Sequence, residues 1–169
     1  MIKATAPGRA GIIGNPTDIY GGNVISSSIG ERAYCRLIES ERLIVTVAGE
    51  TTDLSGDAGL ALIGDRYDIT RAALRALEID PGKARFSMEM RTDVPEQGGL
   101  AGSTALLATV VGCLTAYLEL DLNRYEMAET IRQIEAEVMC MTCGYQDHYM
   151  AVFGGINFMD FRGKENMRP

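Results

Sequence analysis

Apolar and polar residues recur along the chain with periods that predict strands mainly in the first half and helices mainly in the second. Alternation predicts strands at residues 1–6, 24–28, 32–39, 43–48, 84–91 and 156–161. Apolar side chains spaced three and four residues apart predict helices at residues 65–78, 103–120 and 124–138. Asn123 and Glu126 match a capping box at the start of the last helix. This order indicates a two-layer α+β domain.

Two segments lack a regular period and are expected to be loops. Glycine and proline are dense between residues 7 and 22, so no long regular element is expected there. The polar side chains of this segment are either solvated loop residues or ligand contacts, and composition does not decide between them. They are Arg9, Asn15, Asp18 and Tyr20. The second expected loop spans residues 51–64.

Size and charge restrict the class of protein. With 169 residues, of which 46% are hydrophobic, the chain suits one globular domain or a large part of a two-domain protein. A net charge of −7 and the lack of a basic run make nucleic acid and anionic membranes poor partners. No apolar stretch is long enough to span a membrane, and the N-terminus lacks a signal peptide's apolar core, so we expect a cytoplasmic protein.

Cysteine and histidine give little support for a metal site. Among the four cysteines only Cys140 and Cys143 form a C-x-x-C pair, and a second pair of zinc ligands is missing. Reduced thiols are expected, with redox chemistry as the alternative. The single histidine, His148, excludes a His-rich site.

A glycine-rich stretch, residues 95–105, joins a predicted strand to the predicted helix at 103–120. The first N–H groups of a helix have no internal partners, and the helix dipole makes that end partly positive. A glycine turn leading into a helix therefore favours an anion, above all a phosphate. The alternative is a tight turn with Ser103 as a helix cap. No Gly-Lys-Ser/Thr follows, so this is not a Walker P-loop.

Two further carboxylates are candidates for chemistry. Asp147 lies at a loop or helix start, where it is either a cap or a functional group. Glu135 and Glu137 lie near the end of a predicted helix, where a carboxylate opposes the dipole, although solvent exposure would explain either one.

Three segments resemble motifs of the GHMP kinases, and together they span nearly the whole chain. These are Ala6-Pro7-Gly8-Arg9 with Gly21-Gly22, Pro95 to Ala105, and Cys143-Gly-x-x-Asp147 with Gly154-Gly155. Within this superfamily the first and third segments resemble glucuronokinases and heptose-phosphate kinases most. The resemblance implies the ribosomal protein S5 domain 2-like fold. It also implies an N-terminal domain at residues 1–161 and, at 162–169, the start of a linker to a C-terminal domain absent from this sequence.

The resemblance also assigns roles to individual residues. It implies that Asp147 is the catalytic base and that Arg9 lies beside it. The phosphates of ATP would be bound by Gly98, Gly99, Leu100, Ala101, Gly102, Ser103 and Thr104. Ser103 and Glu135 would bind Mg²⁺, Glu135 being preferred to Glu137 because it lies twelve positions before Asp147. Asp18, Tyr20 and Gln146 would contact the sugar.

The implied activity is transfer of the γ-phosphoryl group of Mg·ATP to a sugar hydroxyl, the anomeric one in the related sugar kinases. The partners would be the sugar, ATP and the absent second domain. The apolar face that this second domain would cover favours self-association into a homo-oligomer. Without the second domain, the chain is expected to be poorly active. The alternatives are a non-catalytic sugar- or nucleotide-sensing relative and a mevalonate-type alcohol kinase.

Overall fold

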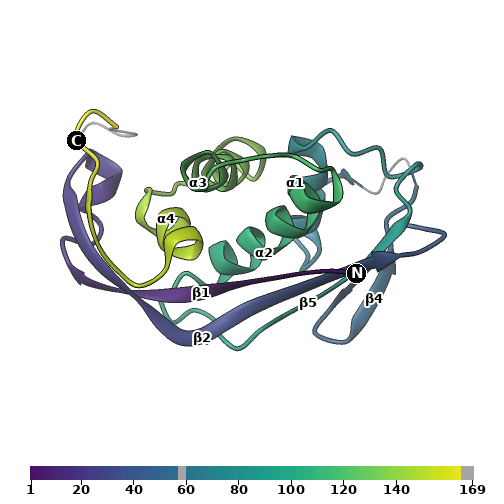
Figure 1. Cartoon of the computed structure of the whole chain (residues 1–169), viewed down its shortest axis with the longest axis horizontal. Coiled ribbons are helices and arrows are strands. Elements are labelled where there is room, and N and C mark those ends of the chain that lie inside the picture. Colours follow the sequence, from purple (N-terminus) through teal and green to yellow (C-terminus); the bar gives the residue numbers. More distant parts are fainter. Residues whose placement is uncertain (57–59, 165–169) are drawn as a thin grey trace.

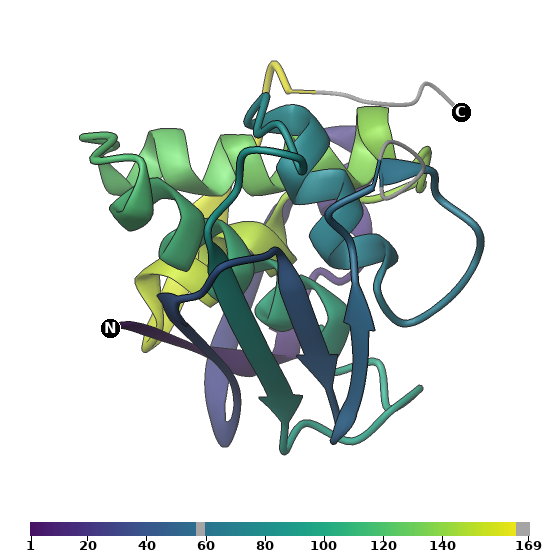
Figure 2. The same cartoon turned by 90° about the vertical axis from the view of Figure 1, so that its right-hand side faces the viewer.

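A computed structural model describes residues 1–56 and 60–164 of the chain. One curved sheet forms a layer, and the helices gather against its concave face (Figure 1). Seen from the end, the opposite face of the sheet carries no helix among the described residues (Figure 2). The predicted α+β architecture of two layers is confirmed.

The sheet has six strands and a mixed pattern of pairing. They are β1 (Ile2–Ile13), β2 (Asn23–Glu39), β3 (Ile44–Val47), β4 (Glu50–Asp53), β5 (Phe86–Thr92) and β6 (Ile156–Asp160). The order is β1-β2-β5-β3-β4, with β6 also paired to β2. β3 and β5 are parallel and the other pairs are antiparallel. Cys35 of β2 lies opposite both Ala4 and Met90, so these three side chains share the buried face.

Strands β1 and β2 are longer than the sequence predicts. β1 continues through Pro7 into the expected loop at residues 7–22. A proline is tolerated there because β1 lies at the edge of the sheet and its register with β2 shifts between Pro7 and Arg9. β2 continues through Gly30, although the sequence predicted two separate strands at residues 24–28 and 32–39. Its two ends have separate partners, β6 at residues 23–27 and β5 at residues 33–39, and β1 pairs along both parts.

The expected loop at residues 51–64 is also corrected, because its start belongs to β4. This strand is mostly exposed and pairs only with β3, so it carries no alternating apolar signal. Residues 57–59 of this segment lie outside the described residues, as do residues 165–169 of the expected linker.

The helices cover the sheet around one central helix. They are α1 (Asp68–Ala76), α2 (Gly102–Tyr117), α3 (Arg124–Gln133) and α4 (Gln146–Phe153), with short turns η1 (Thr17–Tyr20) and η3 (Ile134–Val138). α2 packs against β1, β2, β5 and the other three helices, which buries it nearly all round. The predicted capping box at Asn123 and Glu126 is confirmed. None of the helices in the described part combines the length and the apolar character needed to cross a bilayer.

One main core lies between the sheet and the helices. The side chains of Phe86, Met88 and Met90 on β5, which alternate with polar neighbours, are fully buried beneath α2. Leu107 and Leu114 of α2 lie in the same core. Each Å² of apolar surface buried in this core stabilises the fold by about 25 cal/mol.

The start of α1 is attached to the preceding loop by a partly buried network of ion pairs and hydrogen bonds. Asp68 accepts the backbone N–H groups of Ile63 and Gly64, at 3.1 and 2.6 Å, and the Arg71 guanidinium at 2.7 Å. Burial raises the pKa of Asp68, but these hydrogen bonds outweigh it and lower the pKa below its usual value. The network stabilises the carboxylate form and therefore the start of α1.

We expect Asp68→Asn to lower the free energy of unfolding by about 1–2 kcal/mol at neutral pH, since one charged acceptor of three hydrogen bonds is lost. Because folding lowers the pKa of Asp68, its carboxylate stabilises the folded state at pH values above the unfolded pKa, near ~3.9. This stabilisation is lost as the pH falls through the folded pKa. The difference between the two proteins in urea titrations should therefore shrink toward acid pH. A difference that grows toward acid would contradict this account.

Candidate active site

The glycine-rich stretch forms a turn that leads directly into α2. Gln97, Gly99 and Ala101 have left-handed backbone conformations, with φ of 56°, 66° and 58°. Such angles are strained for the two non-glycine residues, and strain of this kind concentrates at functional sites. Ala101 is the N-cap residue and supplies no side-chain hydrogen bond. Ser103 is a helical residue of α2 and not its cap, so the first N–H groups of α2 are not capped by a side chain.

A cleft of about 580 Å³ opens over this turn. Residues 94–103 form one wall, and Arg9 and Asp147 also line the cleft. Val47, Ile69 and Leu106 give it an apolar part. The glycine turn and Asp147 therefore face one shared space, as the kinase hypothesis requires.

Arg9 joins the catalytic candidate to the glycine turn. Its Nε donates to Oδ1 of Asp147 at 2.7 Å, and its Nη2 lies 2.6 Å from the same oxygen. Its Nη1 donates to the carbonyl oxygen of Gly99 at 2.7 Å. The guanidinium is largely buried, so these contacts are little screened by solvent. Arg9 thus fixes the position of Asp147 relative to the phosphate-binding candidate.

The backbone of β1 packs tightly against the same turn. The N–H group of Arg9 donates to the carbonyl oxygen of Leu100 at 2.9 Å. A Cβ atom on Gly8 would lie 2.9 Å from that oxygen, which is closer than side chains tolerate. Glycine at position 8 therefore allows the first motif to contact the second.

Asp147 is the second residue of α4, near the helix N-terminus, and its side chain is 29% exposed. Burial raises the pKa of this carboxyl group, and the neighbouring Arg9 only partly offsets that effect. A raised pKa makes a carboxylate a better proton acceptor. Asp147 thus lies at the cleft with a pKa above that of an ordinary aspartate, and its role as a general base stays a prediction.

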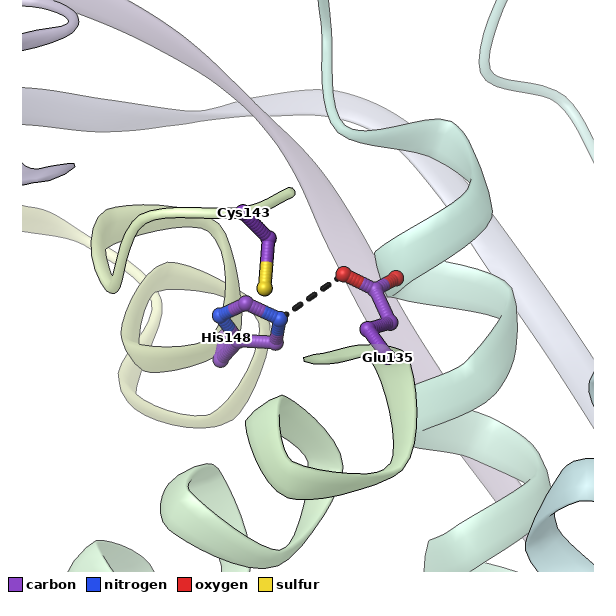
Figure 3. Close-up of side chains that lie close together, drawn as sticks. All are labelled: Glu135, Cys143 and His148. Carbon is purple, nitrogen blue, oxygen red and sulfur yellow. Dashed lines mark hydrogen bonds and ion pairs between the residues drawn. The ribbon is translucent and has the colours of Figure 1, made fainter. Parts of the chain in front are cut away.

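Glu135 belongs to η3, a single π-helical turn at the end of α3, and is buried. Its Oε1 accepts the hydroxyl of Thr104 at 2.9 Å, and its Oε2 lies 2.8 Å from Nε2 of His148 (Figure 3). Glu137 is exposed. Both oxygens of Glu135 therefore have partners that hold the carboxylate in place next to the start of α2.

Thr104 and His148 were not expected around Glu135. Thr104 was predicted to bind phosphate, yet its side chain is buried and is directed to Glu135 instead of lining the cleft. Burial lowers the pKa of His148, but hydrogen bonds with Cys143 and Glu135 raise it overall, to about 9. The only sequence signal was one histidine near a carboxylate candidate.

The three predicted sugar-binding residues differ in exposure. Asp18 is buried and accepts the backbone N–H groups of Tyr145 and Gln146, at 2.7 and 3.0 Å. The Gln146 side chain is also buried and contacts Ser26, Asn15 and Asp18. Tyr20 is exposed. In this structure Asp18 and Gln146 join η1 to the start of α4, and their contact with a sugar stays a prediction.

The cleft is also lined by two arginines, Arg66 and Arg91, which the sequence analysis did not single out. Arg66 pairs with Glu50 at 2.7 Å, and Arg91 pairs with Asp93 at 2.6 Å. Both pairs are largely exposed, so each adds little to stability, and the carboxylates of Glu50 and Asp93 offset the charges of the two arginines. Neither arginine lies in a recognisable motif.

The sequence of the chain is similar to those of known sugar kinases. The chain is 32% identical to D-glycero-alpha-D-manno-heptose 7-phosphate kinase of Campylobacter jejuni, covering 95% of this chain and 50% of that protein. It is 27% identical to Glucuronokinase 1 of Arabidopsis thaliana, covering 94% and 48%. The chain thus spans about half the length of the curated relatives it matches.

Solved structures give the same fold. A D-glycero-D-manno-heptose 1-phosphate kinase from Bacteriodes thetaiotaomicron superimposes with a TM-score of 0.81 at 25% identity, covering 96% of this chain and 56% of that one. Residues 68–155 match the family described as the GHMP kinases N terminal domain. This agrees with the expected ribosomal protein S5 domain 2-like fold. Because the family match covers more than half of the residues and the glycine turn lies inside it, the chain belongs to the GHMP kinases.

Proposed function

We propose that this chain is the N-terminal part of an ATP-dependent sugar kinase that transfers the γ-phosphoryl group of Mg·ATP to a sugar hydroxyl, the anomeric one. One observation carries the proposal. The Arg9 side chain contacts both Asp147 and the carbonyl oxygen of Gly99 at the edge of one cleft. Phosphoryl transfer needs a phosphate cradle and an oriented acceptor close together.

The cleft suits a nucleoside triphosphate. The uncapped N–H groups at the start of α2, with Ser103 exposed beside them, can donate to phosphate oxygens. The apolar part at Val47, Ile69 and Leu106 suits a flat base. Arg66 and Arg91 line the same cleft, and their exposed ion pairs can be exchanged for contacts with phosphate oxygens.

Asp147 and Arg9 would act on the acceptor. A sugar hydroxyl placed against Oδ2 of Asp147, the oxygen that Arg9 does not contact, would be oriented toward the γ-phosphate and would lose its proton to the carboxylate. Arg9 would steady the negative charge that develops on the transferred group. Asp18, Tyr20 and Gln146 would define the sugar pocket, Asp18 and Gln146 by holding the start of α4 in place.

We infer that Ser103 and Glu135 would hold a magnesium ion. Ser103 and Glu135 offer hydroxyl and carboxylate oxygens, which Mg²⁺ prefers, and Thr104 places Glu135 next to the helix turn that carries Ser103. Bound there, Mg²⁺ would screen the charge of the phosphates. Each carboxylate oxygen of Glu135 has more than one lone pair, so it can bind the ion while it still accepts the hydrogen bond from Thr104.

Several large apolar side chains of β1 and β6 are exposed. Register places Ile13 and Phe158 on either side of Ile25, and Ile12 and Ile156 are exposed nearby. Exposed apolar patches of this kind mark interaction surfaces. We infer that this surface packs against the second domain of the whole kinase, or against a second copy when that domain is lacking.

Coupled ADP release by the full-length protein would test the function. Sugars, uronic acids, heptose phosphates and mevalonate should be compared at saturating Mg·ATP. We expect ADP release with one class of sugar. Turnover with mevalonate alone would identify an alcohol kinase, and sugar or nucleotide binding without ADP release would identify a sensor.

We expect Ser103→Ala to raise the KM for Mg·ATP by about tenfold, because one hydroxyl ligand of the metal–phosphate complex is lost, worth roughly 1–1.5 kcal/mol. The measurement is a Mg²⁺ titration at fixed ATP. Ser40→Ala, an exchange outside the cleft, should leave the titration unchanged. A Mg²⁺ dependence identical in Ser103→Ala and the wild type would refute the assignment.

A further inference from the structure

Three side chains that could bind a transition metal converge behind the proposed active site. Glu135 comes from η3, His148 from α4, and Cys143 from the segment that precedes α4. Figure 3 shows the three side chains directed toward one another. One ligand atom from each lies within 4.8 Å of the others. The sequence did not indicate this cluster, because the three residues are neither a C-x-x-C pair nor a His pair.

The geometry is close to that of a metal site. Zn²⁺ binds thiolate sulfur at about 2.3 Å and imidazole nitrogen or carboxylate oxygen at about 2.0–2.2 Å, so tetrahedral ligand atoms lie about 3.3–3.6 Å apart. Nε2 of His148 is now 2.8 Å from Oε2 of Glu135, and the widest separation is at most 4.8 Å. Movements of about 1 Å would therefore bring all three atoms to bonding positions.

The surroundings also favour a ligand. His148 is completely buried, and its Nδ1 has no hydrogen-bond partner within the part of the chain that the structure describes. Nε2, the nitrogen on the other side of the ring, is the one that lies beside Glu135 and would bind the cation. Cys143 is only partly buried and so gives access from solvent. Thr104 already orients Glu135, as a supporting partner orients a metal ligand.

We propose that Glu135, Cys143 and His148 form a binding site for a thiophilic divalent cation of the zinc class, and that this cation competes for Glu135 with the Mg²⁺ of the kinase reaction. Binding displaces protons from Cys143 and His148 to the buffer and leaves a fourth coordination position open. Sulfur and imidazole ligands select such a cation over Mg²⁺. The site itself is independent of the proposed function, whereas the competition rests on it.

The test uses Co²⁺ as a spectroscopic probe on the metal-free full-length protein. Wild type should bind one equivalent and show a thiolate-to-cobalt charge-transfer band that Zn²⁺ abolishes by displacement. Cys143→Ser should lose the band and weaken binding by at least about tenfold. Cys140→Ser changes the exposed cysteine of the same segment, and it should keep both the charge-transfer band and the cobalt affinity of the wild type. If circular dichroism shows that Cys143→Ser is misfolded, His148→Gln is tested in its place. The same loss of cobalt affinity is expected for that variant.

The outcomes separate the two parts of the proposal. No Co²⁺ binding in the wild type, an intact band in Cys143→Ser, or its loss in Cys140→Ser would overturn the site. Zn²⁺ should inhibit ADP release by the wild type and by Cys140→Ser, and excess Mg²⁺ should restore it. Cobalt binding at Cys143 in a kinase insensitive to Zn²⁺ would overturn the competition alone. Cobalt binding in a protein without any turnover would instead count against the kinase assignment.

Discussion

Asp147→Asn should lower kcat of the full-length kinase by at least about 10²-fold, the usual scale of general base catalysis. Asparagine keeps the shape of the side chain but cannot accept the proton of the acceptor hydroxyl. The exchange also leaves the buried Arg9 guanidinium without its ion pair. Because the phosphates are proposed to bind at residues 98–104 and not at Asp147, the KM for ATP should change much less than kcat. Initial rates over a matrix of sugar and ATP concentrations measure both quantities.

The pH dependence gives an independent check on Asp147. A base must be deprotonated, so kcat should fall as pH decreases through the pKa of Asp147. Burial raises that pKa, so the acid limb should lie at higher pH than for an ordinary aspartate. Asp121→Asn, at an exposed position outside the cleft, should leave rate and pH profile unchanged. Wild-type turnover in a folded Asp147→Asn protein would remove Asp147 from catalysis.

Gly144→Ala should destabilise the fold by at least about 2 kcal/mol, because a Cβ atom has no space at this position. That atom would lie 1.9 Å from Oδ2 and 2.6 Å from Cγ of Asp18. Asp18 is buried and accepts the N–H groups of Tyr145 and Gln146, so its carboxylate cannot move away without losing hydrogen bonds. A hydrogen bond to a charged group contributes about 1.5–3 kcal/mol.

Chemical denaturation of Gly144→Ala measures the effect, and Gly30→Ala provides a matched control. Gly30 has no heavy atom within 4 Å of the position that a Cβ would occupy. Its exchange should change the unfolding free energy by no more than about 0.5 kcal/mol. Equal denaturation midpoints for the two variants would contradict the close packing of Gly144 against Asp18. A large loss in Gly144→Ala alone would confirm that Asp18 secures the helix that carries Asp147.

Local patterns were sufficient for much of the fold. The alternation of Phe86, Met88 and Met90 predicted β5, and the periodic apolar positions after Ser103 predicted α2. The predictions were wrong where pairing partners override local preference. Pro7 and Gly30 do not interrupt their strands, because neighbouring strands hold the backbone extended on either side of them.

Single motifs indicated Arg9, the glycine turn and Asp147, because their chemistry depends on residue type and local spacing. The family resemblance placed Arg9 beside Asp147, and the ion pair between them confirms this, but the motifs did not indicate the partners of Glu135 or Asp18. Sequence spacing preferred Glu135 to Glu137, but only burial against Thr104 and His148 distinguishes their environments. Asp18 was expected at a sugar, and the fold shows it holding backbone N–H groups at the start of α4.

The sequence by itself determined the two-layer class, the phosphate-binding candidate at residues 95–105 and the family, since these depend on periodicity and on short motifs. Tertiary structure alone decided that the Arg9 side chain also contacts the carbonyl oxygen of Gly99, 90 positions away, and that Glu135, Cys143 and His148 converge. The physical reason is that side-chain contacts between distant segments follow from how the helices pack on the curved sheet. Periodicity shows which face of an element is buried, but not which residue of another element it meets.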